Sequence, residues 1–347
     1  MRDRIIKMAK VLHHTVLYFF FLILGFPLFY FVYKYGDPEP LAHDFFQYYR
    51  LYFNWDIGNV NAPFNMRLAG ASLVHLFYEL GFSYDTVIVF DKYASWGFLK
   101  SVFFCAVFFN YLCVAATCLQ LYITIKKHVG GFLISLFGGV LYLLGFGTVF
   151  YELMPLTDAF SVLLFAIGFH LYLNKSYWVM APIMVLIFQR EYLLMALGLM
   201  AFMDLIKNRE KRFYFTMLIA ATISFLIYYV LRKTVFYTPA LDHQASTGFL
   251  MDTFMQFKLP DFDFIKQTAM TMNLFFIYLA VVFYKRFKGL ETDKYNLLIV
   301  FLIFLQLTII CLAAGHGNNM GRYFYLIVPY VIFQLIKEVK ALAVFSA

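Results

Sequence analysis

Residues 15–34 read TVLYFFFLILGFPLFYFVYK, a stretch whose only charged side chain is Lys34, at its end. A helix that crosses a bilayer needs about 20 mostly apolar residues, which this stretch supplies. Four basic residues in the first ten positions precede it. No small-residue cleavage site follows it, so the sequence predicts an uncleaved membrane span rather than a signal peptide that is removed.

The composition of the whole chain points the same way. Of its 347 residues, 63% are hydrophobic and 14% are charged, and the mean hydropathy is +0.74. A soluble domain carries about 25% charged residues, so this chain has too little polar surface to face water. The composition excludes a soluble enzyme, a nucleic-acid-binding module and a disordered chain. We therefore expect membrane lipids, and no nucleic acid, among its partners.

Further apolar stretches have the length or pattern of spanning helices. They are residues 97–125, 131–150, 158–173, 177–189, 191–206, 213–231, 267–284, 295–314 and 322–339. The sequence thus predicts an all-α polytopic protein, with about ten transmembrane helices in a single integral membrane domain over residues 1–347. Gln189-Arg190-Glu191 interrupts one long apolar run. Because charge at mid-membrane costs several kcal/mol, we expect these residues at a hairpin tip or in a cavity that water reaches.

The distribution of charge predicts the orientation. Ten spans place both termini on one side, and 17 of the 28 Lys and Arg residues then fall on that face, whereas 14 of the 20 Asp and Glu residues fall on the other. The excess of Lys and Arg marks the cytoplasmic side. Very short cytoplasmic loops and a compact layout favour a bacterial inner membrane over the endoplasmic reticulum. The polar groups then face the periplasm or the outside.

Two long segments, residues 35–96 and 232–266, lie on the predicted outer face. Within the first, 41–53 (LAHDFFQYYRLYF) and 64–80 (FNMRLAGASLVHLFYEL) repeat aromatic or leucine side chains at helical spacing. We expect two helices lying in the outer interface, with their aromatic rings at headgroup level. The second segment, with LPDFDF at 259–264, is a candidate for a further interfacial element.

Ionisable and polar residues gather near the outer ends of the predicted spans, whereas His170 and Asp204 lie well within spans. Charge at membrane depth usually marks the path of a substrate or an ion. The four cysteines lie in apolar stretches without metal-ligand spacing and are expected to be small buried hydrophobes. The outer set comprises Asp44, Arg67, Glu152, Asp158, Arg190, Glu191, His316, Asn318, Asn319 and Arg322.

Two carboxylates in this set admit two interpretations each. Asp44 lies one helical turn before Tyr48, so the two share a face; Asp44 is either a general base in a cavity or a solvated interfacial residue. Asp158 follows Thr157 and opens a span, where helix capping is the favoured role and substrate contact the alternative.

The basic residues of the set also have alternatives. The depth of Arg190 and Glu191 favours a place in a site over a structural pair. Arg322 either snorkels to the interface or captures phosphate, for which the guanidinium fork is suited. His316 stands between two glycines and is either a ligand contact or part of a plain turn.

Common catalytic signatures do not occur in the sequence: it has no Walker A, GxSxG, HExxH or GxGxxG pattern. Asp261 and Asp263 lack the glycine and glutamate that complete a calcium loop. A divalent metal is compatible with the site if two acids converge, but nothing in the spacing demands one. No cofactor is therefore assigned, and any transfer reaction needs a donor that is already activated.

Four short segments resemble parts of the GT-C superfamily of polytopic glycosyltransferases: HDFFQYY at 43–49, PFNMRL at 63–68, MPLTDA at 154–159 and QRE at 189–191. The last two are similar to segments of bacterial members. The layout over the whole chain is similar too. The family uses sugars linked to polyprenyl or dolichyl phosphate on the outer or lumenal side. Two departures, no adjacent Asp-Glu pair in the first outer loop and no large C-terminal soluble domain, leave the acceptor class open.

The resemblance implies an inverting transfer of sugar from a polyprenyl-phosphate donor to a lipid-linked or envelope glycan acceptor. Asp44 would be the catalytic base, with Asp37, between Gly36 and Pro38, the less favoured choice. The arginines would neutralise the phosphate that leaves. The residues assigned to substrate binding are Arg67, Asp158, Arg190, Glu191, His316, Arg322 and Tyr48.

Two other functions fit the same sequence features, namely the many spans, the long outer segments and the arginines. A transporter or flippase for a lipid-linked or anionic solute would use polar groups along a path through the membrane. The sequence has no internal repeat, and its polar groups lie towards one face, which favours an enzyme. A polysaccharide polymerase that acts on lipid-linked units is the closest enzymatic alternative.

Overall fold

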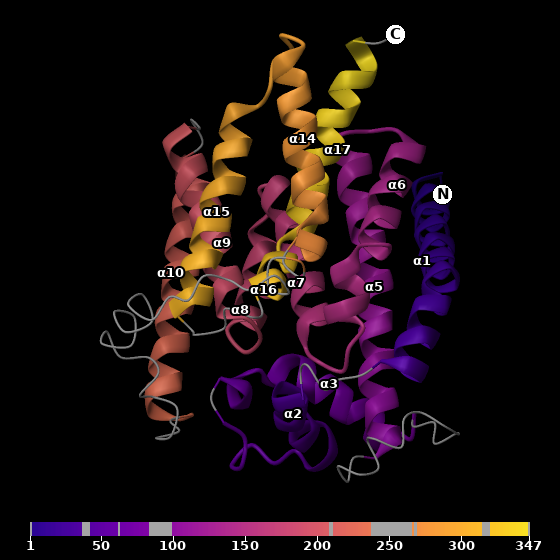
Figure 1. The fold of residues 1–347 in the computed structure, drawn as a ribbon, viewed down its shortest axis with the longest axis vertical. Coiled ribbons are helices and arrows are strands. Elements are labelled where there is room, and N and C mark those ends of the chain that lie inside the picture. Colours follow the sequence, from indigo (N-terminus) through magenta and orange to yellow (C-terminus); the bar gives the residue numbers. More distant parts are fainter. Residues whose placement is uncertain are drawn as a thin grey trace.

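The computed structural model describes residues 2–36, 42–61, 63–82, 99–207, 211–236, 266, 269–313 and 320–345. Within these residues every regular element is a helix, which confirms the all-α prediction (Figure 1). Most helices run side by side along one direction, and two short helices cross one end of this bundle. The described parts near both termini lie towards the opposite end.

Among the described residues, three helices are long and apolar enough to cross a membrane: α1 (Arg2–Tyr35), α5 (Lys100–His128) and α10 (Lys211–Thr234). The protein buries 72% of the apolar window of α5 but only 28% of those of α1 and α10. Helix α5 is therefore largely covered by its neighbours. Helices α1 and α10 present large apolar side chains outwards, as helices at the perimeter of a membrane protein do.

The remaining helices of the bundle fall on the other predicted apolar segments. One predicted span, 322–339, is divided into two helices, and the second begins at Val328 with Pro329 in its first turn. The bounds are α6 (Phe132–Leu143), α7 (Asp158–Leu173), α8 (Met180–Leu186), α9 (Glu191–Lys207), α14 (Asn273–Phe287), α15 (Lys294–Ala313), α16 (Met320–Tyr325) and α17 (Val328–Phe345).

Helix α6 ends earlier than predicted, at Leu143 instead of residue 150, and the chain continues through a turn into a π-helix, η3 (Thr148–Glu152). The turn accommodates the ring of Tyr325. A side chain at Gly147 would place its Cβ 2.2 Å from the Tyr325 ring, so only glycine allows this close approach. The prediction of one continuous helix over 131–150 was therefore wrong, because the α-helix is interrupted before the residues on which the Tyr325 ring packs.

The two predicted helices of the first outer segment are present as α2 (Ala42–Asn54) and α3 (Leu68–Glu79), the latter preceded by a 3₁₀ turn, η2 (Phe64–Met66). Their expected environment was wrong for α2. The rings of Phe45, Tyr48 and Tyr52 are 0% exposed, so they are packed inside the protein rather than at headgroup level. Helix α2 thus closes one end of the bundle.

The ionisable residues predicted within spans have ordinary structural partners. His170 Nδ1 lies 3.0 Å from the Thr124 hydroxyl, and the Tyr172 hydroxyl donates to Asp204 at 2.5 Å. His170 lies in the last turn of α7, and Asp204 lies three residues before the end of α9. The segment 259–264, with Asp261 and Asp263, lies outside the described residues, as do Asp37, His316, Asn318 and Asn319.

Candidate functional site

A buried ionic cluster lies where α2 and α3 meet the bundle. Five separate parts of the chain supply it: α2, the residue before α3, the start of α7, the residue before α9, and α16. Their side chains converge although the first and last are 278 residues apart. We call this set the arginine cluster, and its members are Asp44, Arg67, Asp158, Arg190 and Arg322.

Asp158 is the centre of the arginine cluster. Its Oδ1 accepts a hydrogen bond from Arg190 Nη2, and its Oδ2 accepts one from Arg322 Nε at 2.5 Å. The residue is 1% exposed. Thr157, not Asp158, is the N-cap of α7, and it makes no capping hydrogen bond. The helix-capping interpretation of Asp158 was therefore wrong, because two guanidinium groups hold this carboxylate.

Asp44 is the second carboxylate of the cluster, and it shares a hydrogen-bond donor, Arg322, with Asp158. Arg322 Nη1 donates to Asp44 Oδ2, so Arg322 bridges Asp44 and Asp158. The side chain of Asp44 is 21% exposed, against 1% for Asp158. Of the two carboxylates, Asp44 is therefore the one that is accessible from outside the protein.

Arg67 is held by phenols instead of carboxylates. Its Nη1 donates to the Tyr48 hydroxyl at 3.1 Å and its Nη2 to the Tyr192 hydroxyl at 2.9 Å. Burial lowers the pKa of the Arg67 guanidinium, but the oxygens of Tyr192 and Tyr48 and the carboxylate of Glu191 outweigh it, so this pKa lies well above its ordinary value. Arg67 thus remains charged although it is buried.

Tyr192 links two arginines and was not predicted as a site residue. Arg190 Nη1 donates to its hydroxyl at 2.7 Å, so Arg67 and Arg190 share one phenol oxygen. The phenol holds two like charges side by side. Glu191, half-buried at the start of α9, interacts electrostatically with Arg67.

Each guanidinium of the cluster keeps one nitrogen without a hydrogen-bond partner among the described residues. These buried atoms are Arg67 Nε, Arg190 Nε and Arg322 Nη2. A buried donor without a partner costs about 1–3 kcal/mol, more when it is charged. The unpartnered nitrogens fit a bound anion that accepts several hydrogen bonds.

Gln189 fixes the position of the turn between α8 and α9. Its Oε1 accepts from the Gly70 backbone N–H at 2.8 Å, and its Nε2 donates to the Thr157 carbonyl at 2.6 Å and to Ser161 Oγ at 2.9 Å. The turn that joins α8 to α9 therefore lies inside the protein, with Gln189 and Arg190 buried. A glutamine in an apolar run was the sequence signal for this role, whereas Tyr192 carries no such signal.

Glu152 lies outside the cluster in a second buried polar group. It is 1% exposed, and its Oε2 accepts a hydrogen bond from the Tyr142 hydroxyl. Its Oε1 has no partner within the described part of the chain. Thr148 Oγ1, in the same π-helix, lies 2.6 Å from the Tyr325 hydroxyl. The arginine cluster does not use this carboxyl group.

The described cysteines and acids do not form a recognisable metal centre. Cys105, Cys113 and Cys118 are buried and unpaired, as expected for small hydrophobes. Across the residues that the structure describes, no group of three or more His, Cys, Asp or Glu side chains could hold a metal ion.

No protein-family model, curated protein or solved structure matches this chain. The geometry and charge of the arginine cluster therefore carry the functional argument.

Proposed function

We propose that the chain is a GT-C-like membrane glycosyltransferase that moves a sugar from a polyprenyl-phosphate donor to a lipid-linked or envelope glycan acceptor. The observation that carries this proposal is the arginine cluster, with one unpartnered nitrogen on each of its three guanidinium groups among the described residues. Phosphate oxygens are the acceptors that guanidinium groups bind best. A lipid phosphate would occupy the cluster.

The setting in the membrane belongs to the same proposal. About ten of the helical segments would cross a bacterial inner membrane, with both termini in the cytoplasm. The position of the described terminal helices opposite α2 and α3 supports this orientation (Figure 1). The arginine cluster would then face the periplasm, where lipid-linked sugars are exposed.

The reaction would be a direct displacement at the anomeric carbon. The acceptor oxygen attacks from the side opposite the phosphate, and Asp44 takes the proton of the acceptor hydroxyl. The bond between the anomeric carbon and the phosphate oxygen breaks, and its electron pair goes to the phosphate. Arg67, Arg190 and Arg322 stabilise the charge that develops there. The anomeric configuration is inverted.

Arg67→Gln is the variant that tests phosphate binding. Arg67 donates to two phenols, so its loss leaves the ion pairs of Asp158 with Arg190 and Arg322 in place. Removal of one charge-assisted contact, about 1.5–3 kcal/mol, should weaken the binding of polyprenyl phosphate by about 10- to 100-fold. Titration of the purified protein with polyprenyl phosphate, followed by native mass spectrometry, measures this affinity.

Arg50→Gln is the matched control. Arg50 lies in α2, at the same end of the bundle, but it donates to the Asn59 carbonyl and is not part of the arginine cluster. Its replacement should leave the affinity for polyprenyl phosphate unchanged. Equal affinities of wild type and the Arg67→Gln variant would contradict a phosphate site in the cluster.

A second candidate function is proton-coupled transport of an anionic solute, and buried Glu152 favours it. A carboxyl group in a protein core within a membrane, with one oxygen lacking a partner in the described residues, is suited to carry a proton. In that case Glu152→Gln should abolish solute uptake by proteoliposomes under a proton gradient. A transferase should retain most of its turnover with this variant, so the two assays together separate the candidates.

A further inference from the structure

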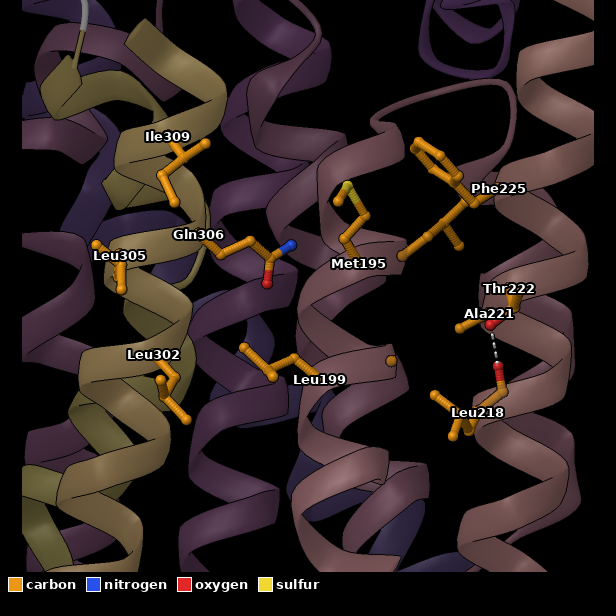
Figure 2. Close-up of a pocket in the computed structure, with 12 residues that line it drawn as sticks. Met195, Leu199, Leu218, Ala221, Thr222, Phe225, Leu302, Leu305, Gln306 and Ile309 are labelled. Atoms are coloured by element: carbon orange, nitrogen blue, oxygen red, sulfur yellow. Dashed lines mark hydrogen bonds between the residues drawn. The ribbon is translucent and has the colours of Figure 1, made fainter. Parts of the chain in front are cut away.

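An apolar groove of about 620 Å³ lies between α9, α10 and α15 (Figure 2). Side chains such as Leu199, Leu218 and Leu302 line it, one from each helix. Several neighbouring side chains on α10 and α15 are exposed, including Ile223 at 51% and Phe301 at 56%. The groove therefore opens towards the part of the surface that lipid would cover.

Gln306 is the polar exception in this groove. Its amide points from α15 towards α9 (Figure 2). Both its Nε2 and its Oε1 are buried, and neither has a hydrogen-bond partner among the described residues. An amide that offers a donor and an acceptor is satisfied by a group with both, such as a hydroxyl or another amide. Buried polar atoms normally have such partners, so this pair of atoms calls for a ligand.

The groove lies directly inward of the arginine cluster. Leu194, which lines the groove, follows Tyr192 by two residues in α9, and Tyr192 accepts hydrogen bonds from Arg67 and Arg190. With a rise of about 1.5 Å per residue, Gly198 lies about 9 Å along α9 from Tyr192. An amphiphile with its chain in the groove would thus hold its head beside the cluster.

We propose that this groove binds the hydrocarbon chain of the lipid acceptor, and that the acceptor carries a hydroxyl or amide group that hydrogen-bonds to Gln306. A polyprenyl chain is pure hydrocarbon and offers nothing to this amide, so the donor's chain lies elsewhere. The acceptor class is then an amide-linked or hydroxylated lipid. This assignment rests on the proposed transferase function, which it extends from the donor to the acceptor.

Two small residues keep the groove open. Gly198 in α9 faces Ala221 in α10, and a Cβ at Gly198 would lie 3.3 Å from the Ala221 Cβ. Gly198 also lines the groove, so a larger side chain at position 198 would crowd Ala221 and take up space at this wall of the groove. Gly198→Leu is a blocking variant, whereas Gln306→Leu removes the hydrogen bond and retains an apolar wall.

The test compares two lipids of equal chain length that both end in a primary hydroxyl, which is the acceptor group that faces Asp44 and so is not the group that binds Gln306. An N-acylsphinganine carries an additional amide and a second hydroxyl, and a dialkylglycerol carries neither. The wild-type protein is offered an equal mixture in detergent, and native mass spectrometry measures which lipid it retains. We expect about a tenfold preference for the N-acylsphinganine, which one neutral hydrogen bond supplies.

The variants make the outcome decisive. Gln306→Leu should retain both lipids equally, and Gly198→Leu should retain little of either. Asp44→Asn should keep the wild-type preference even though transfer is lost, so failure of the transferase proposal is distinguishable from failure of this one. Equal retention of the two lipids by the wild type would overturn the assignment. Loss of polyprenyl phosphate binding in the Gly198→Leu variant would overturn it too, because the groove would then hold the chain of the donor.

Discussion

Replacement of Asp44 with Asn is expected to abolish sugar transfer while the fold stays intact. The amide side chain of the Asp44→Asn variant retains an oxygen that can accept the hydrogen bond from Arg322 Nη1, so the contact that positions Asp44 can persist. An amide, however, does not take up the proton of the acceptor hydroxyl. Loss of a general base typically lowers turnover by about 10²- to 10⁴-fold. Transfer of a radiolabelled sugar from its polyprenyl phosphate in proteoliposomes measures the effect.

Asp293→Asn provides the control for this variant. Asp293 is also a partly exposed carboxylate paired with a cation, Lys337, at 3.0 Å. It precedes α15 at the opposite end of the bundle, so its replacement should leave sugar transfer at the wild-type rate (Figure 1). Near-normal transfer by the Asp44→Asn variant would exclude Asp44 as the base and leave the arginine cluster as a binding site alone.

The helical segments of this chain were predictable because each is a run of apolar residues long enough to be read locally. The interruptions within the predicted helices were not predictable, since residues from distant parts of the sequence pack there. The ring of Tyr325, more than 170 residues away in sequence, packs against Gly147, four residues after the end of α6. A window of local hydropathy contains no information about such a contact.

The environment of α2 shows the same limit. Aromatic residues at helical spacing predict an amphipathic helix, and α2 forms. Whether its aromatic face contacts lipid headgroups or protein depends on which other segments of the chain pack against it. Phe45 packs edge-on against Phe103 of α5, with the ring centroids 6.0 Å apart, and the Tyr52 hydroxyl donates to the Pro155 carbonyl at 3.4 Å. Periodicity alone does not distinguish the two environments.

The members of the arginine cluster were all candidates from sequence, because charge is rare in so apolar a chain. Their pairing was not predictable. Asp158 fitted a local helix cap, whereas its partners Arg190 and Arg322 lie 32 and 164 residues further along the chain. Tyr192 is one of 27 tyrosines, so nothing in the sequence marks it as the group that joins two arginines.

Asp158→Leu is expected to be the most destabilising single change in the cluster. Arg190 loses its ion pair and Arg322 loses one of its two, while both guanidinium groups stay buried. Removal of one partner from a buried ion pair costs about 3–5 kcal/mol, because the remaining charge has no compensation. The apparent melting temperature in detergent should fall accordingly. The second change Arg190→Leu, added to Asp158→Leu, should restore part of the loss, since it removes one uncompensated charge.

A buried ion pair at the other end of the bundle provides a control that distinguishes an effect on stability from an effect on phosphate binding. Lys285 in α14 donates to Glu338 in α17, and both residues are 3% exposed. Glu338→Leu should lower the melting temperature by a similar amount, since it also leaves one buried charge alone. It should not weaken the binding of polyprenyl phosphate, whereas Asp158→Leu should change that binding because two arginines of the cluster lose their common anchor. A variant Asp158→Leu as stable as the wild type would contradict the central position of Asp158.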